Sequence, residues 1–196
     1  MNRAAHWDAA FAGGDEQRSW YQARPSESLQ TIERMVSDRD VAIIDVGGGA
    51  SALSGALLDS GYLDLTVLDI SKTALSLAES RLGKSAERIT WIAADVLAWR
   101  PTPATSSGMT GPCCTSSSRR MIAGPTRRPL HEALAPGGYA IIAGFAPAGP
   151  DRCSGLPVHR SSADDILDLS AAGLAPSRAV LRSTPSRRTG SSRLRG

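Results

Sequence analysis

The 196-residue chain contains no uninterrupted apolar run of about 18 residues, the length that a membrane-spanning helix requires. Its first twenty residues are too polar and too charged for a signal peptide. We therefore expect a soluble, cytoplasmic protein. Its length fits one domain with an adequate hydrophobic core, and we find no internal repeat.

Cysteine and histidine are also scarce, with three residues of each. Cys113 and Cys114 are adjacent and Cys153 stands alone, so their spacing fits neither a zinc site nor a disulfide framework. His6 and His159 are more simply interpreted as solvated side chains than as catalysts, and no Ser-His-Asp set is legible. The sequence predicts no metal centre and leaves the catalytic residue unknown.

Acidic residues are absent from two stretches, residues 101–129 and 176–196, which carry four and six arginines. These stretches account for the basic character of the whole chain, whose formal net charge is +3 and whose pI is near 9.0. Without their ten arginines, 12 basic and 19 acidic residues remain, a net charge of −7. The overall charge therefore argues only weakly for nucleic-acid binding, although a basic tail as written can bind a polyanion nonspecifically.

The most informative segment is an apolar run that enters a glycine turn, Val41-Ala42-Ile43-Ile44-Asp45-Val46-Gly47-Gly48-Gly49. The run has the length of a parallel strand that is covered on both faces. Glycine lacks a Cβ, so the chain can turn sharply and a ligand can approach its backbone, while the first amides of the next helix face that ligand. The pattern predicts a nucleotide cradle; a ligand-free glycine turn is the alternative for this motif alone.

Two further apolar runs end in Asp69 and Asp95. Asp69 lies 20 residues after Gly49, where a second parallel strand presents a carboxylate to both ribose hydroxyls. Because the carboxyl ends of parallel strands share one edge of a sheet, we expect Asp45, Asp69 and Asp95 to converge on one nucleoside. Each aspartate alone is more commonly a helix cap or a solvated strand end.

In this combination the chain resembles the class I S-adenosylmethionine-dependent methyltransferases, over residues 1 to about 100 and again over about 130 to 170. The resemblance implies an α/β, Rossmann-like, doubly wound fold with a mostly parallel sheet and helices on both faces. It also implies S-adenosyl-L-methionine as cofactor. In this family the glycine segment cradles the methionine part, the acid of the second strand holds the ribose, the next residue packs on adenine, and the acid of the third strand reads the adenine edge. The cofactor-binding residues implied here are Asp45, Gly47, Gly48, Gly49, Asp69, Ile70, Asp95 and Val96.

Two other segments carry the resemblance. Residues 134–143 resemble the family's helix, Pro-Gly-Gly turn and fifth strand, and residues 6–8 and 19–22 resemble the leader of a small bacterial-type branch. The implied activity is methyl transfer to an unidentified acceptor, either a small molecule or a protein, with no membrane partner. A general base is needed only if the acceptor arrives protonated. The motif does not specify the acceptor or the oligomeric state.

Residues 101–129 interrupt this resemblance where the family places its central fourth strand, between the first and the fifth. The segment has scarcely an apolar pair, so the strand is doubtful as written. A strand there buries about five large apolar side chains, each worth roughly 1.5–3 kcal/mol. Read one base earlier, the codons for residues 107–117 permit Val-Trp-His-Asp-Arg-Ala-Val-Leu-His-Phe-Leu, an apolar strand and a helix start. We hypothesise a reading-frame shift that opens near Pro101 and closes near Leu130; a genuine flexible insertion or lid is the alternative.

We expect one methyltransferase-like domain over residues 1–175, which includes the anomalous stretch 101–129. A disordered basic tail over 176–196 replaces the family's closing hairpin, which makes that hairpin doubtful too. Ser71 is the expected N-cap of one helix and Gly83 its stop. The helices expected from apolar spacing and end signals span residues 26–36, 51–59, 72–82 and 162–169.

Two other functions remain open. The glycine segment also satisfies G-x-G-x-x-A, and Asp69 has the ribose spacing, as in an NAD(P)-dependent oxidoreductase. Asp45 before the glycines and Asp95 after the third strand favour methyl transfer, and no Tyr-x-x-x-Lys pair supports the dehydrogenases that use one. The second alternative is a noncatalytic methyltransferase remnant, because the centre and the tail are anomalous.

Overall fold

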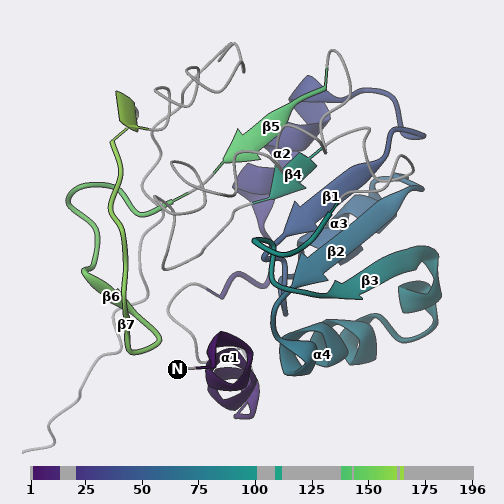
Figure 1. Ribbon diagram of the computed structural model, residues 1–196. Helices are drawn as coiled ribbons and strands as arrows, with labels where there is room; N and C mark the ends of the chain where they lie inside the picture. Colours follow the sequence, from purple (N-terminus) through teal and green to yellow (C-terminus); the bar gives the residue numbers. More distant parts are fainter. Residues whose placement is uncertain are drawn as a thin grey trace, which may run out of the picture.

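The computed structural model describes residues 2–13, 21–100, 109–111, 138–142, 144–162 and 164–165. Within them, a five-stranded parallel sheet has the order β3-β2-β1-β4-β5 (Figure 1). Its strands are β1 (Ile43–Val46), β2 (Leu65–Asp69), β3 (Ile89–Ala93), β4 (Met109–Gly111) and β5 (Ala140–Ile142). The predicted α/β fold with a mostly parallel sheet is confirmed.

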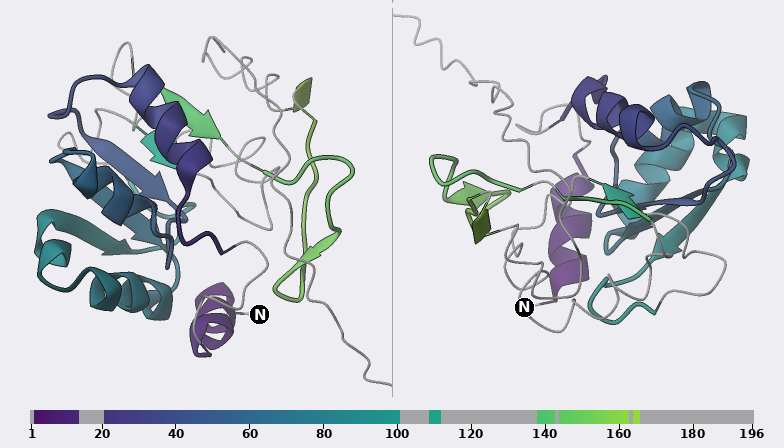
Figure 2. Two further views of the ribbon diagram at one scale, coloured as in Figure 1. Left: turned by 180° about the vertical axis from the view of Figure 1, so that it is seen from behind. Right: turned by 90° about the horizontal axis from the view of Figure 1, so that it is seen from above.

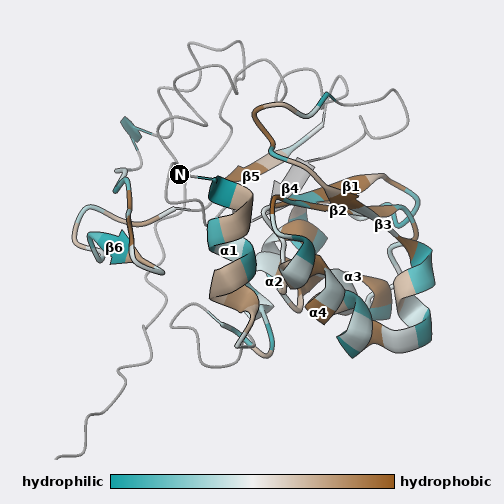
Figure 3. Ribbon diagram, turned by 60° about the horizontal axis from the view of Figure 1, so that its bottom comes forward, coloured by the Kyte–Doolittle hydropathy of each residue, from teal (hydrophilic) through white to brown (hydrophobic). Residues whose placement is uncertain are grey.

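Three helices, α2 (Ser26–Met35), α3 (Leu53–Asp59) and α4 (Lys72–Leu82), pack on one face of this sheet. The bounds of α4 agree with the sequence prediction, because the Ser71 hydroxyl accepts the amide of Ala74 and Gly83 takes a positive φ of 55° after the last turn. A 3₁₀ helix, η1 (Gly83–Arg88), then leads into β3. The main core between helices and sheet comprises Ile32, Ile43, Leu53, Leu57, Leu58, Tyr62, Leu65, Val67, Leu75 and Ile89. Figure 3 shows the hydrophobic colouring of β1 and β2 above these helices.

A smaller apolar cluster lies on the opposite face of the sheet, where Ile44, Val46 and Leu68 pack against Trp99. Alternate residues of a strand point to opposite faces, which is why Val67 joins one cluster and Leu68 the other. The turn that follows β3 covers this second face. The resemblance implies helices on this face as well. Among the described residues, α2, α3 and α4 all pack on the other face.

The strand β4 lies between β1 and β5, where Met109 pairs with Ile44 of β1 and Ala140 of β5. The fourth strand, which the sequence made doubtful, is therefore present over three residues. The reason is that strand pairing uses the backbone N–H and C=O groups, which a polar segment also has. The rest of the 101–129 stretch lies outside the described residues, so the frame-shift hypothesis stays a prediction.

A further helix, α1 (Arg3–Phe11), and a separate antiparallel hairpin, β6 (Arg152–Cys153) and β7 (Leu156–Pro157), lie on the side to which the strand arrows point (Figures 1 and 2). Trp7 and Phe11 anchor α1 against Ala50 and Ala74. The sequence analysis did not predict α1 as a helix. Among the described residues, no helix combines the length and the apolar character needed to cross a bilayer.

Several C-terminal predictions fall outside the described residues. Of the helix expected over 162–169, Asp164 and Asp165 are described and are helical. The end of the expected domain at residue 175, the expected tail over 176–196 and the family's closing hairpin lie outside the described ranges. These predictions remain as stated.

Candidate functional site

The turn after β1 places two consecutive glycines directly against two carboxylates. A Cβ on Gly48 would lie 2.5 Å from Oδ2 of Asp45, and a Cβ on Gly49 would lie 2.9 Å from Oδ2 of Asp69. Gly47 and Gly49 also have positive φ values of 75° and 43°, which side-chain-bearing residues rarely adopt. Each glycine of the predicted cradle is therefore required by backbone conformation, by space, or by both.

Asp45 is buried, with 2% of its surface exposed, on the strand end beneath this turn. Neither of its carboxylate oxygens has a hydrogen-bond partner. Burial, and to a smaller extent the negative charge of Asp69, raises the pKa of Asp45 to about 7. A buried carboxylate with no partner is costly, so this position favours either a bound proton or a positive charge nearby.

Asp69 ends β2, and its Oδ1 accepts the amide of Ser71 at 2.8 Å. Burial raises the pKa of Asp69 to about 6, against the opposing effect of hydrogen bonds from the backbones of Ser71, Ile70 and Gly49. The negative charge of Asp8 contributes to the rise. The structure thus brings the glycine turn and two of the three predicted acids together, with half-buried Ile70 beside them.

Asp8 of α1 also belongs to this region, although the sequence analysis assigned no role in the site to it. Its Oδ1 accepts the hydroxyl of Ser71 at 2.7 Å and the amide of Thr73 at 3.0 Å. The Ser71 hydroxyl and the Thr73 amide lower the pKa of Asp8. An acid from α1 therefore stabilises the amino end of α4, where the helix dipole favours negative charge.

Asp95 lies on the neighbouring strand end, since the amide of Ala94 donates to the carbonyl of Asp69 at 2.9 Å. One carboxylate oxygen of Asp95 accepts the amide of Leu97 at 2.9 Å, and the other lies 3.6 Å from a guanidinium nitrogen of Arg3. The side chains of Arg3 and Asp95 are 40% and 33% exposed, so the pair contributes little to stability. One oxygen of Asp95 therefore has the local capping role that we gave as its alternative. The other oxygen faces Arg3 of α1.

Val96, the last predicted cofactor residue, packs against the cluster of Ile44, Val46, Leu68 and Trp99. It is only partly buried there. Its place next to Asp95 keeps it at the same edge of the sheet as the other predicted residues. Its packing supports the turn that carries Asp95.

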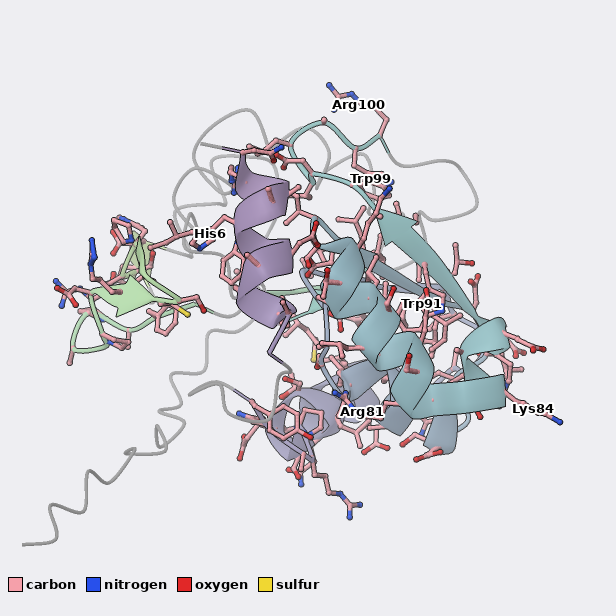
Figure 4. The ribbon with its side chains drawn as sticks, turned by 90° about the horizontal axis from the view of Figure 1, so that it is seen from below. His6, Arg81, Lys84, Trp91, Trp99 and Arg100 are labelled. Atoms are coloured by element: carbon pink, nitrogen blue, oxygen red, sulfur yellow. The ribbon has the colours of Figure 1, made fainter. Side chains whose placement is uncertain are left out.

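His6 connects α1 to the hairpin. Its Nε2 lies 3.2 Å from the carbonyl oxygen of Ser154, and its ring meets Trp7 edge to face with centroids 5.7 Å apart. Figure 4 shows His6 projecting from α1 toward the hairpin. Ser154 and Gly155 have φ values of 49° and 79°, the pair of positive values that a two-residue hairpin turn requires. The interpretation of His6 as merely solvated is corrected, because a partner 148 residues away holds it.

Sequence reasoning therefore missed the contribution of α1, which reaches Asp95 through Arg3 and the start of α4 through Asp8. Two local signals precede these contacts. Asn2 caps the helix by accepting the amide of Ala5, and Trp7 and Phe11 are spaced four residues apart on one face. Neither signal predicts that Asp8 contacts the amino end of α4.

A hollow of about 500 Å³ lies elsewhere, between the start of α2, α3 and α4. Arg24 and Arg81 contribute to its lining, and none of the predicted cofactor residues does. The candidate site therefore rests on the carboxylates and glycines at the strand ends. No group of three or more His, Cys, Asp or Glu suited to a metal ion occurs in the part of the chain that the structure describes.

Comparison with known proteins finds no matching protein family and no matching curated protein. Solved structures do match. A protein studied for the conversion of a disulfide bond into a thioacetal group during echinomycin biosynthesis has a TM-score of 0.65 and 22% identity, over 86% of this chain and 77% of its own.

Two solved methyltransferases contain S-adenosylhomocysteine. The Haemonchus contortus phosphoethanolamine N-methyltransferase 2 has a TM-score of 0.63 and 16% identity, over 87% of this chain and 41% of its own. A Thiobacillus denitrificans S-adenosylmethionine-dependent methyltransferase has a TM-score of 0.53 and 16% identity, over 72% of this chain and 56% of its own. The chain thus spans about half the length of these two proteins. It has the fold of the class I S-adenosylmethionine-dependent methyltransferases.

Proposed function

We propose that this protein transfers a methyl group from S-adenosyl-L-methionine to an acceptor. The single observation that carries the proposal is the pair of carboxylates, Asp45 and Asp69, set directly against consecutive glycines at the strand ends. This arrangement joins a backbone surface that a ligand can approach closely with an acid placed for ribose hydroxyls. The shared fold supports the same function, although a fold by itself does not determine a reaction.

The residues fit this cofactor on two physical grounds. A Cβ at Gly48 or Gly49 would collide with a carboxylate, so the turn keeps its backbone bare. The unpartnered oxygens of Asp45 make the region favourable for a cation, and the cofactor carries positive charge. In this proposal the glycine turn and Asp45 hold the methionine part, and Asp69 accepts the ribose hydroxyls. Ile70, Asp95 and Val96 border the adenine.

When bound, S-adenosyl-L-methionine supplies a methyl group that its sulfonium has already activated. The protein's task is to orient the acceptor and to keep water away. Helix α1 suits this task, since Asp8 and Arg3 fasten it across the ends of β2 and β3. The acceptor is a small molecule or a protein, and the reaction takes place in the cytoplasm, as the sequence predicts.

The oxidoreductase alternative gains no support from the structural neighbours reported above. The other alternative is a noncatalytic methyltransferase remnant. One ligand-binding experiment distinguishes it from the enzyme. That experiment is calorimetric titration of S-adenosylhomocysteine into the purified chain, with NADH as a parallel ligand. The same titration is made on a variant whose residues 107–117 carry the sequence Val-Trp-His-Asp-Arg-Ala-Val-Leu-His-Phe-Leu, which the codons permit when read one base earlier.

Asp69→Asn and Asp64→Asn form a matched pair of variants, because these acids stand at opposite ends of β2. Asp64 is exposed and lies away from the glycine turn. In Asp69→Asn, charge-assisted hydrogen bonds to the ligand worth roughly 1.5–3 kcal/mol are lost. We therefore expect S-adenosylhomocysteine to bind this variant about 10- to 100-fold more weakly. The Asp64→Asn variant should bind as the parent chain does.

Each outcome of the titration has a clear meaning. Binding to the chain as written supports the proposal and makes the altered stretch dispensable for the cradle. Binding only to the variant with the alternative reading means that the chain has a methyltransferase cradle and that the anomalous stretch as written has damaged it. NADH binding without S-adenosylhomocysteine binding, or no binding to either chain, overturns the proposal.

A further inference from the structure

Asp45 and Asp69 form a carboxylate pair at the ends of two neighbouring strands. They lie against consecutive glycines, and the charge of Asp69 acts on Asp45. Asp45 is almost fully buried and has no hydrogen-bond partner on either oxygen. Two carboxylates so placed cannot both ionise without a large cost, because like charges and burial both oppose it.

The other charged groups around the pair do not remove this cost. Asp8 of α1 adds a third negative charge, next to Asp69. Arg3 of α1 is directed to Asp95 at the end of β3. Lys72, in the first turn of α4, is exposed and is not among the groups that shift the pKa of either acid. The strand β4, the other neighbour of β1, contains no charged residue.

We propose that the cradle without ligand keeps a proton on the Asp45 and Asp69 pair, and that the ammonium group of the bound ligand displaces it. This inference rests on the proposed function, which places the amino-acid part of the ligand on the glycine turn. The proton passes to solvent, and the positive charge of the ammonium takes its place. The charge of the two carboxylates together with the ammonium group then equals that of the protonated pair before binding; the ligand's own carboxylate is additional to this count.

The physical reason is the low local dielectric. The carboxylate of Asp45 is buried against Gly48 of the turn, so its interaction with a cation bound to the turn is weakly screened. The ligand thus stabilises the ionised pair, which the empty cradle disfavours. Linkage then requires that binding and proton release occur together, so affinity depends on pH.

The test is calorimetry with S-adenosylhomocysteine, which carries the ammonium group but no sulfonium. Titrations at pH 6 and pH 8.5 are each made in two buffers of different ionisation enthalpy, which gives the number of protons released. With the pKa of Asp45 at about 7, we expect close to one proton per ligand at the lower pH and close to none at the higher. The association constant should rise by up to about tenfold per pH unit below neutrality.

Two controls identify the groups involved. 5′-Methylthioadenosine lacks the amino-acid part, so it should bind without displacing the proton. Asp45→Asn should release fewer protons than the parent when it binds S-adenosylhomocysteine, because only Asp69 of the pair then remains to lose one. Asp64→Asn should release as many protons as the parent does. If Asp45→Asn fails to fold, the two-buffer comparison and the methylthioadenosine control still decide the question.

The outcomes separate this inference from the function on which it rests. S-adenosylhomocysteine binding with the same affinity at both pH values and without proton release overturns the inference alone. Equal proton release by 5′-methylthioadenosine overturns the role of the ammonium group. A complete lack of S-adenosylhomocysteine binding overturns the proposed function and this inference with it.

Discussion

Replacing Asp45 by asparagine should flatten the pH dependence of the stability of the ligand-free protein. The pKa of Asp45 rises from 3.8 to about 7 on folding, mainly because the carboxyl is buried. The folded state therefore binds this proton more tightly than the unfolded state does. The stabilisation is complete below the unfolded pKa and is lost as the pH rises through about 7.

The magnitude follows from the size of the shift. A rise of about three pH units at about 1.36 kcal/mol per unit corresponds to about 4 kcal/mol in the free energy of unfolding. Roughly 2–3 kcal/mol of this falls between pH 5 and pH 8. Asp69, whose pKa is about 6, contributes in the same direction and remains in the variant. Relative to Asp45→Asn, the parent chain should therefore lose roughly 2–3 kcal/mol in the free energy of unfolding over this range.

Urea unfolding followed by far-ultraviolet circular dichroism at several pH values between 5 and 8 measures this difference. Asp64→Asn is the matched control, because it removes an exposed acid from the other end of β2 and should keep the parent's pH dependence. If the parent and Asp45→Asn lose stability in parallel as the pH rises, Asp45 does not carry the proton and the reasoning is refuted.

Three further substitutions test the site and its supports. Gly49→Ala places a Cβ 2.9 Å from Asp69 Oδ2 at a positive φ, so we expect a loss of roughly 1–2 kcal/mol in stability and weaker S-adenosylhomocysteine binding, measured by urea unfolding and calorimetry. Asp8→Ala removes the acceptor at the start of α4 and should cost about 1 kcal/mol while hydrogen exchange in α1 accelerates; unchanged exchange would contradict the anchoring role. Tyr62→Phe removes the 2.7 Å hydrogen bond to the Val36 carbonyl and should cost roughly 0.5–1.5 kcal/mol in urea unfolding without affecting ligand binding.

Local signals in the sequence predicted a large part of this architecture. Apolar runs of strand length predicted β1, β2, β3 and β5, and the Ser71 cap with the Gly83 stop predicted both ends of α4. These features depend on the alternation of side chains along a strand and on unpaired amides at a helix end. The spacing from the glycines to Asp69 also predicted their proximity, because parallel strands bring their carboxyl ends to one edge.

The sequence was a poorer guide where distant backbone partners decide the structure. Met109 to Gly111 has little strand signal, yet it pairs between β1 and β5 because both neighbours offer free backbone groups. Helix α1 has only two large apolar residues, Trp7 and Phe11, and its position is decided by the distant residues that it contacts. His6 meets Ser154 and Asp8 meets Thr73, contacts that span 148 and 65 residues of the chain.

The sequence alone therefore determined the glycine turn and the two acids, Asp45 and Asp69, at the ends of neighbouring strands. Only the tertiary structure decided the state of those acids. Asp45 has an elevated pKa because folding buries it without a partner and sets Asp69 beside it, whereas Asp8 has a lowered pKa because folding brings the Ser71 hydroxyl and the Thr73 amide to it. Burial and hydrogen bonding are properties of the three-dimensional surroundings, so identical side chains acquire opposite chemistry.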